Sequence, residues 1–201
     1  MPSQVAESTA KQGAKPVIAA LTQVGVDAAR LASLEQQVGA LQQSAQRIKQ
    51  PIGLVGPSDG NAALCDAAYH IANRLARTGL VLVCGGRGGV MEAASRGGQD
   101  AGGIVIGLLP GNDDSAANAY LSVAIPTGMG EMRNALIARS SLCLVAIGGG
   151  MGTLSEMAFG LKLGKPVFCL QPEFDLPDAK SVADVDDAVH QVLGWLLASR
   201  G

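Results

Sequence analysis

The chain has 201 residues, of which 27 are glycine and only 3% are aromatic, and its formal net charge at pH 7 is −2. An apolar content of 48% with 16% charged residues excludes a chain that is disordered throughout. The glycines have no three-residue period, which excludes collagen. The length predicts one domain of about 150 residues with an appendage.

Composition also limits the expected partners and compartment. A strong nucleic-acid binder needs a concentrated basic face, and this chain is slightly acidic. No uninterrupted apolar run reaches about 18 residues, and the polar N-terminus lacks the apolar core of a signal peptide. We therefore expect a cytoplasmic protein that binds neither nucleic acid nor a membrane.

The residues that most often bind metals do not form a recognisable site. The four cysteines are Cys65, Cys84, Cys143 and Cys169. They fit no zinc pattern, and three lie in apolar strand-like runs, so we predict buried, reduced thiols and no metal. Asp113 and Asp114 follow a Pro-Gly pair; a divalent metal is one interpretation of them, and a solvated turn is the favoured one.

The first 50 residues form the predicted appendage. Residues 1–16 are polar and predicted to be disordered, whereas residues 27–49 have the apolar spacing of a helix. The seam of this helix is Leu31, Leu34, Val38, Leu41, Ala45 and Ile48. We expect the seam to pack on the main domain or on a partner subunit, and Pro51 to end the helix.

Residues 51–201 alternate apolar runs with helical runs. Strands are predicted at residues 52–56, 80–84, 104–109, 121–125, 142–147 and 166–170, and helices at 62–78, 90–101, 129–140, 153–163 and 185–199. Continuous apolar strands indicate a parallel sheet covered on both faces. This predicts a doubly wound, mostly parallel α/β fold of Rossmann type, which binds ligands beyond the carboxyl ends of its strands.

The longest glycine loop joins a predicted strand to a predicted helix, with the sequence Gly148-Gly149-Gly150-Met151-Gly152-Thr153. Glycines bring backbone N–H groups close to an anion, and the helix adds the positive end of its dipole. The loop is neither a P-loop nor a G-x-G-x-x-G motif. We interpret residues 149–153 as a phosphate-binding loop; a tight turn without a ligand is the alternative.

Other candidate contacts follow neighbouring strands or open a helix. Gly56 ends the first predicted strand, and Gly85, Gly86 and Arg87 begin a second glycine loop. We favour a ligand contact for Arg87 over a position in solvent. Arg133, at a predicted helix start, reaches the ligand or forms a surface ion pair, which contributes little to stability.

The carboxylate of Glu156 has two interpretations. Thr153 and Glu156 have the spacing of a capping box, in which the glutamate only accepts a backbone N–H. Alternatively, Glu156 lies one turn beyond the phosphate loop and faces the ligand. The spacing alone leaves both interpretations open.

Three of these motifs occur in a characteristic order: GGRGGVMEAASRGGQDAGGIVIGLLPG, then PTGMGEMRN, then AIGGGMGTLSEMAFGLKLGKPV. In this order they resemble the LOG-like Rossmannoid superfamily, once labelled possible lysine decarboxylases, over residues 52–171. Within it, the chain most resembles the small bacterial and algal branch that includes molybdenum cofactor carrier proteins. The resemblance implies a homodimer or a higher homo-oligomer, and the helical seam suggests the same.

The resemblance also implies an activity. The Lonely Guy enzymes of this superfamily cleave the N-glycosidic bond of adenosine-type monophosphates, and their catalytic arginine and glutamate correspond to Arg133 and Glu156. The glutamate would stabilise an oxocarbenium-like state or activate water, with no cofactor required. Asn134 replaces the lysine of the family pattern and Gly148 its proline, which argues against cytokinin processing.

Other functions compete with an N-glycosidase. The algal carriers that resemble this chain hold molybdenum cofactor, a pterin with a phosphate group, and the same loops would hold it without catalysis. Both functions imply a phosphorylated small molecule as the ligand. Single-stranded DNA binding fits poorly because stacking residues are scarce. Lysine decarboxylation is unsupported, since neither Lys162 nor Lys165 lies in a context suited to pyridoxal phosphate.

Overall fold

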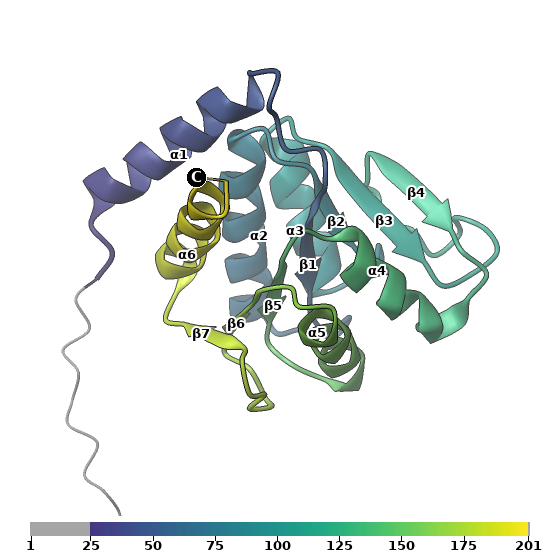
Figure 1. The fold of residues 1–201 in the computed structure, drawn as a ribbon. Coiled ribbons are helices and arrows are strands. Elements are labelled where there is room, and N and C mark those ends of the chain that lie inside the picture. The colour runs from purple at the N-terminus through teal and green to yellow at the C-terminus, as the bar shows by residue number, and fades with distance from the viewer. Residues whose placement is uncertain (1–24, 201) are drawn as a thin grey trace, which may run out of the picture.

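Seven strands form one sheet in residues 25–200, the part of the chain that the computed structural model describes (Figure 1). They are β1 (Ile52–Val55), β2 (Leu82–Cys84), β3 (Val105–Leu109), β4 (Val123–Pro126), β5 (Leu144–Ile147), β6 (Val167–Leu170) and β7 (Lys180–Val182). Their order is β4-β3-β2-β1-β5-β6-β7, with every pairing parallel. The predicted doubly wound α/β fold is thereby confirmed. The disorder predicted for residues 1–16 lies outside the described residues.

The apolar runs that predicted the strands are buried where helices cover both faces of the sheet. Every residue of β1, β2, β5 and β6 is buried. No apolar run predicts β7, because this edge strand has three residues and two of them, Lys180 and Ser181, are exposed.

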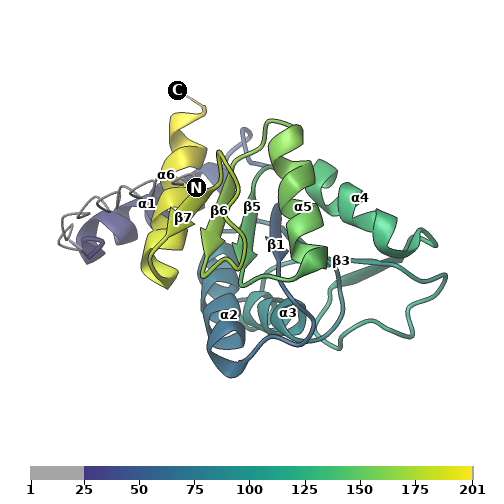
Figure 2. The same cartoon turned by 90° about the horizontal axis from the view of Figure 1, so that it is seen from below.

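Helices lie on both faces of the sheet. They are α1 (Ala28–Gln42), α2 (Ala62–Arg77), α3 (Val90–Asp100), α4 (Asn134–Ser140), α5 (Met151–Lys162) and α6 (Val185–Ala198), with the 3₁₀ helix η1 (Gly130–Arg133) before α4. Ile52 and Leu54 of β1 pack in one core with α1, α2, α3 and α6, whereas Val55 packs in a second core with α4 and α5. The helices of these two cores lie on opposite sides of the sheet (Figure 2). Side chains of β1 therefore alternate between the two faces, as strand geometry requires.

Helix α1, in the described part of the predicted appendage, packs in the main core. Leu31 and Val38 of α1 are buried in the same cluster as α6, so the seam packs on its own domain. The prediction that this helix continues to residue 49 is wrong, since α1 ends at Gln42. The side-chain amide of Gln42 stabilises the turn that follows the helix. Its oxygen accepts a hydrogen bond from the Ile48 N–H at 2.6 Å, and its nitrogen donates one to the Gly79 carbonyl at 2.9 Å.

The sheet places several loops at one end. Strand order reverses at β1, which lies between β2 and β5, and ligands bind outside such a reversal in open α/β sheets. Gly56 follows β1 directly, and a side chain there would meet Val90 at 2.4 Å and the Ile147 carbonyl oxygen at 2.6 Å. Glycine at this position allows the start of α3 and the end of β5 to approach the same loop.

Candidate functional site

A pocket of about 690 Å³ opens at the carboxyl ends of the strands. Its walls come from the loop after β1, the glycine loop after β2, η1 with the start of α4, and the first turns of α5. The predicted site residues that line it are Gly56, Arg87, Arg133, Gly150, Met151, Gly152, Thr153 and Glu156. Residues distant in the sequence thus meet beyond the carboxyl ends of the strands, where the ligand site was expected.

Three predicted contacts, Gly85, Gly86 and Gly149, do not line the pocket. A Cβ on Gly149 would lie 2.5 Å from the Glu173 side chain, so this glycine packs against the loop after β6. A Cβ on Gly85 would lie 2.8 Å from Nη2 of Arg133. The absence of a side chain at Gly85 therefore makes room for the guanidinium that does line the pocket.

The start of α5 suits an anion. Gly150 is the N-cap residue with φ of 121°, and no side chain caps the helix. The first N–H groups of a helix have no partner within it, and they carry the positive end of the helix dipole. Met151, Gly152 and Thr153 present this first turn to the pocket.

The capping-box interpretation of Glu156 is wrong. The helix begins at Met151, two residues before Thr153, so Thr153 is buried in the first turn and is not the N-cap residue. Glu156 instead lines the pocket, although only 5% of its surface is exposed. Burial raises the pKa of its carboxyl to about 8, although the neighbouring Arg133 opposes the shift.

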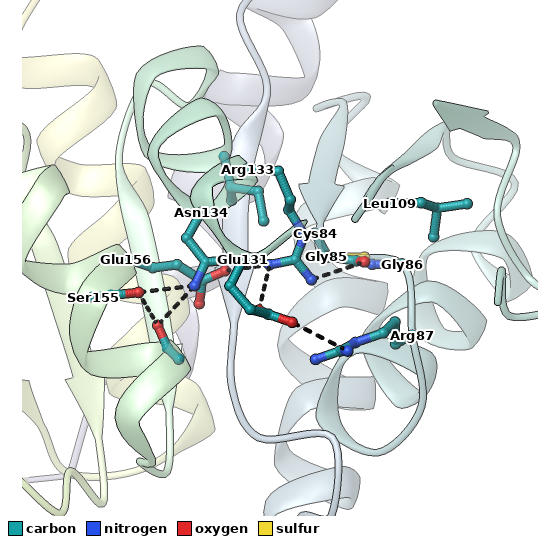
Figure 3. Close-up of polar contacts among 12 residues, drawn as sticks. Cys84, Gly85, Gly86, Arg87, Leu109, Glu131, Arg133, Asn134, Ser155 and Glu156 are labelled. Atoms are coloured by element: carbon teal, nitrogen blue, oxygen red, sulfur yellow. Dashed lines mark hydrogen bonds and ion pairs between the residues drawn. The ribbon is translucent and has the colours of Figure 1, made fainter. Parts of the chain in front are cut away.

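Arg133 is the buried cation beside this carboxyl. Its Nη1 lies 3.7 Å from Oε1 of Glu156, and the exposed fractions of the two side chains are 3% and 7% (Figure 3). Burial lowers the pKa of Arg133, and the carboxylates of Glu156 and Glu131 oppose that shift. The surface ion pair considered for Arg133 is therefore not what the structure shows.

Asn134 fixes the arginine in place. Its side-chain oxygen accepts a hydrogen bond from Nη1 of Arg133. Its side-chain nitrogen donates to Oγ of Ser155 at 2.8 Å and to the Gly152 carbonyl at 3.3 Å. Asn134 thus links the arginine on one helix to the first turns of α5.

A second arginine lies at the mouth of the pocket. Nη1 of Arg87 lies 3.4 Å from Oε1 of Glu131, whose other oxygen, Oε2, lies 3.9 Å from Nη1 of Arg133 (Figure 3). Glu131 is 63% exposed and belongs to η1. A single carboxylate therefore lies between two cations from different loops.

Several pocket residues were not predicted from the sequence. They are Pro57, Ser58, Asp59, Met91, Glu131, Met132, Asn134, Ser155 and Phe159. Glu131 and Asn134 flank Arg133 within a motif that the sequence analysis had singled out, and Phe159 lies one helical turn beyond Glu156. The helical spacing from Glu156 could have predicted that Phe159 faces the pocket. The contacts of Asn134 with Arg133 and Ser155 could not be predicted in this way, because they depend on how α4 and α5 meet.

No group of three potential metal-ligating side chains is found in residues 25–200. The Asp113 carboxylate accepts hydrogen bonds from the Ser115 N–H and hydroxyl, as in a solvated turn. Cys84, Cys143 and Cys169 are buried, Cys65 is half-buried, and all four are free thiols. None of the helices in the described region is both long and apolar enough to cross a membrane.

The fold and this site define a LOG-like α/β protein, and comparison with known proteins agrees. The model of the SLOG cluster4 family matches residues 49–193, and the chain belongs to this family. The resemblance recognised in the motifs is thereby confirmed.

Two solved structures are similar over almost their whole length. The molybdenum cofactor binding protein of Rippkaea orientalis is 32% identical with a TM-score of 0.70, and the match covers 74% of this chain and 99% of that one. The molybdenum cofactor carrier protein of Chlamydomonas reinhardtii is 35% identical with a TM-score of 0.66, covering 75% and 99%.

An enzyme is also among the relatives. A cytokinin riboside 5'-monophosphate phosphoribohydrolase of Arabidopsis thaliana is 35% identical over 116 residues, which make up 55% of this chain. The matched region spans half of the plant enzyme's length. The relatives therefore include both a hydrolase and binding proteins.

Proposed function

We propose that the pocket binds a phosphorylated, nucleotide-like ligand and hydrolyses the N-glycosidic bond of a nucleoside 5'-monophosphate. The observation that carries this proposal is the buried pair of Arg133 and Glu156 beside the uncapped start of α5. A phosphate at the helix start would place the sugar within reach of a cation and a carboxyl group. The similarity to a phosphoribohydrolase supports the same chemistry.

The raised pKa of Glu156 suggests the order of proton transfers. Near neutral pH the carboxyl group keeps its proton, which it gives to the base as the C–N bond breaks and its electron pair moves to the base. The carboxylate that remains faces the oxocarbenium-like sugar. It then takes a proton from the attacking water, which restores the acid.

The test is incubation with AMP and related monophosphates, followed by chromatography for the free base. We expect release by the wild-type protein and a loss of at least about 100-fold in Glu156→Gln, typical of removing a general acid. Glu92→Gln is the matched control, since Glu92 is an exposed carboxylate of α3 that does not line the pocket. Equal rates in wild type and E156Q would refute the role of Glu156.

A second candidate function is binding of molybdenum cofactor without catalysis. Two observations favour it: the near-complete match to molybdenum cofactor binding and carrier proteins, and Asn134 in place of the lysine of the phosphoribohydrolase pattern. The cofactor's phosphate would lie on the same helix start. Retention of molybdenum cofactor by both wild type and E156Q, with no base released by either, would favour this function.

We also propose a homodimer or a higher homo-oligomer, as expected for the superfamily. The seam of α1 does not support this assembly, because Leu31 and Val38 are buried within the chain's own core. Light scattering at several concentrations measures the mass in solution. A monomer at all concentrations would refute assembly.

A further inference from the structure

Each of the two arginines of the pocket has a buried N–H group that donates no hydrogen bond to the described residues. Nε of Arg133 and Nε of Arg87 are buried and have no hydrogen-bond partner within the described residues. The Arg133 side chain is only 3% exposed, and its Nη2 reaches the Gly85 carbonyl only at 3.5 Å. Buried donors without partners are costly, so a site that retains two of them is suited to an incoming acceptor.

The carboxylate between the arginines does not satisfy them. Its oxygens lie 3.4 Å from Arg87 and 3.9 Å from Arg133, whereas charge-assisted N–H···O bonds measure about 2.7–2.9 Å. Glu131 thus contributes charge at the mouth of the pocket but no close hydrogen bond. An oxyanion with more acceptor oxygens could approach both guanidinium groups more closely.

Glu131 can leave this position without rearranging the fold. Its side chain is 63% exposed, and its ion pair with Arg87 joins two partly exposed groups, the class of ion pair that stabilises proteins least. Rotation about its side-chain bonds would carry the carboxylate into solvent. Arg133 would remain in place, because Asn134 accepts from it independently of Glu131.

We propose that Arg87 and Arg133 form an anion clamp, that Glu131 occupies it when the pocket is empty, and that an oxyanion of the ligand displaces Glu131. This inference rests on the proposed function only in that the ligand is anionic. Glu131 then sets ligand specificity: a ligand without an anionic group gains nothing by displacing it, whereas a phosphorylated one replaces one weak carboxylate contact with several charge-assisted bonds.

The test is titration calorimetry with inorganic phosphate, which requires no turnover. We expect Glu131→Gln to bind phosphate about fivefold more tightly than wild type, as expected for removal of a weak competing ion pair. The double variant E131Q/R87Q should lose that gain relative to R87Q alone. Glu92→Gln should bind like wild type, because its charge lies outside the pocket.

Three results would overturn the proposal: phosphate binding by E131Q that is equal to or weaker than that of wild type, the same gain in the R87Q background, or an equal gain in E92Q. Thermal unfolding of each variant verifies that the fold is retained. Failure of the proposed hydrolase function would be separate, since it would appear as absent base release while the effect of E131Q on phosphate binding persisted.

Discussion

At the residue scale, one buried carboxyl group and one buried guanidinium, those of Glu156 and Arg133, lie side by side in the pocket. Removing a charged group from water is costly, which raises the pKa of Glu156 to about 8 and lowers that of Arg133. Strongly shifted groups that face a pocket are typical of functional sites. Folding alone does not require a glutamate at this position, because an apolar residue could fill the same space without the free-energy cost of removing a carboxyl group from water.

Stability should depend on pH through Glu156. The folded protein keeps this proton up to about pH 8, whereas the unfolded chain releases it near the ordinary glutamate pKa of 4.5. Between these values stability should fall as pH rises, by at most about 1.4 kcal/mol per pH unit, and the fall should stop above pH 8. Urea unfolding from pH 5 to 8 should show Glu156→Gln gaining stability over wild type.

Glu92→Gln provides the control for this measurement, since an exposed carboxylate should leave the slope of the wild-type profile unchanged. Parallel pH profiles for wild type and E156Q would contradict the burial argument.

Asn134 should act through Arg133. Asn134→Ala removes the acceptor for the guanidinium, and we expect kcat for base release to fall about tenfold with little change in KM, as for loss of a positioned charge. Ser155→Ala is the matched control, because it removes one partner of Asn134 and one hydrogen bond to the Gly152 carbonyl but leaves the contact between Asn134 and Arg133. Equal losses of kcat in N134A and S155A would show that Asn134 serves only to join the helices.

The sequence could predict Arg133 and Glu156 as candidates because each lies in a recognisable motif. It could not predict how Asn134 and Glu131 bind Arg133, since those contacts depend on side-chain geometry where η1, α4 and α5 converge. It also could not show that Gly149 packs against the loop after β6, because Glu173 is distant in the sequence.

At the element scale, the parallel strands and glycine turns create the pocket. Continuous apolar runs predicted six of the seven strands to within about two residues. For five of them, burial within the sheet leaves no polar alternation, whereas β4 is an apolar edge strand with Val123 and Ile125 exposed. The end of α1 could not be predicted, since a side chain of Gln42 that bonds to Gly79 determines it. Tertiary contacts override helical periodicity at that point.

The docking of α1 should contribute measurably to stability. Val38 is fully buried in the core shared with α6, so Val38→Ala should lower the free energy of unfolding by about 2 kcal/mol. The exposed Gln36 on the same helix is the control, and Gln36→Ala should change stability by less than about 0.5 kcal/mol. An unchanged midpoint of urea unfolding for V38A would mean that α1 is not docked in solution.

At the scale of the whole molecule, one fold serves both catalysis and binding among the relatives. The chain shares its architecture with molybdenum cofactor binding proteins and a region of sequence with a phosphoribohydrolase. Fold alone does not choose between these functions, because function is decided at the site. In this chain the pocket carries Arg133, Asn134 and Glu156 together.

The most direct test measures both products of the proposed reaction at once. Wild-type protein incubated with AMP should release adenine and ribose 5-phosphate in equal amounts, and E156Q should release both at least about 100-fold more slowly. Absence of both products from wild type across a panel of nucleoside 5'-monophosphates, in protein that retains molybdenum cofactor, would contradict the hydrolase and leave the binding function.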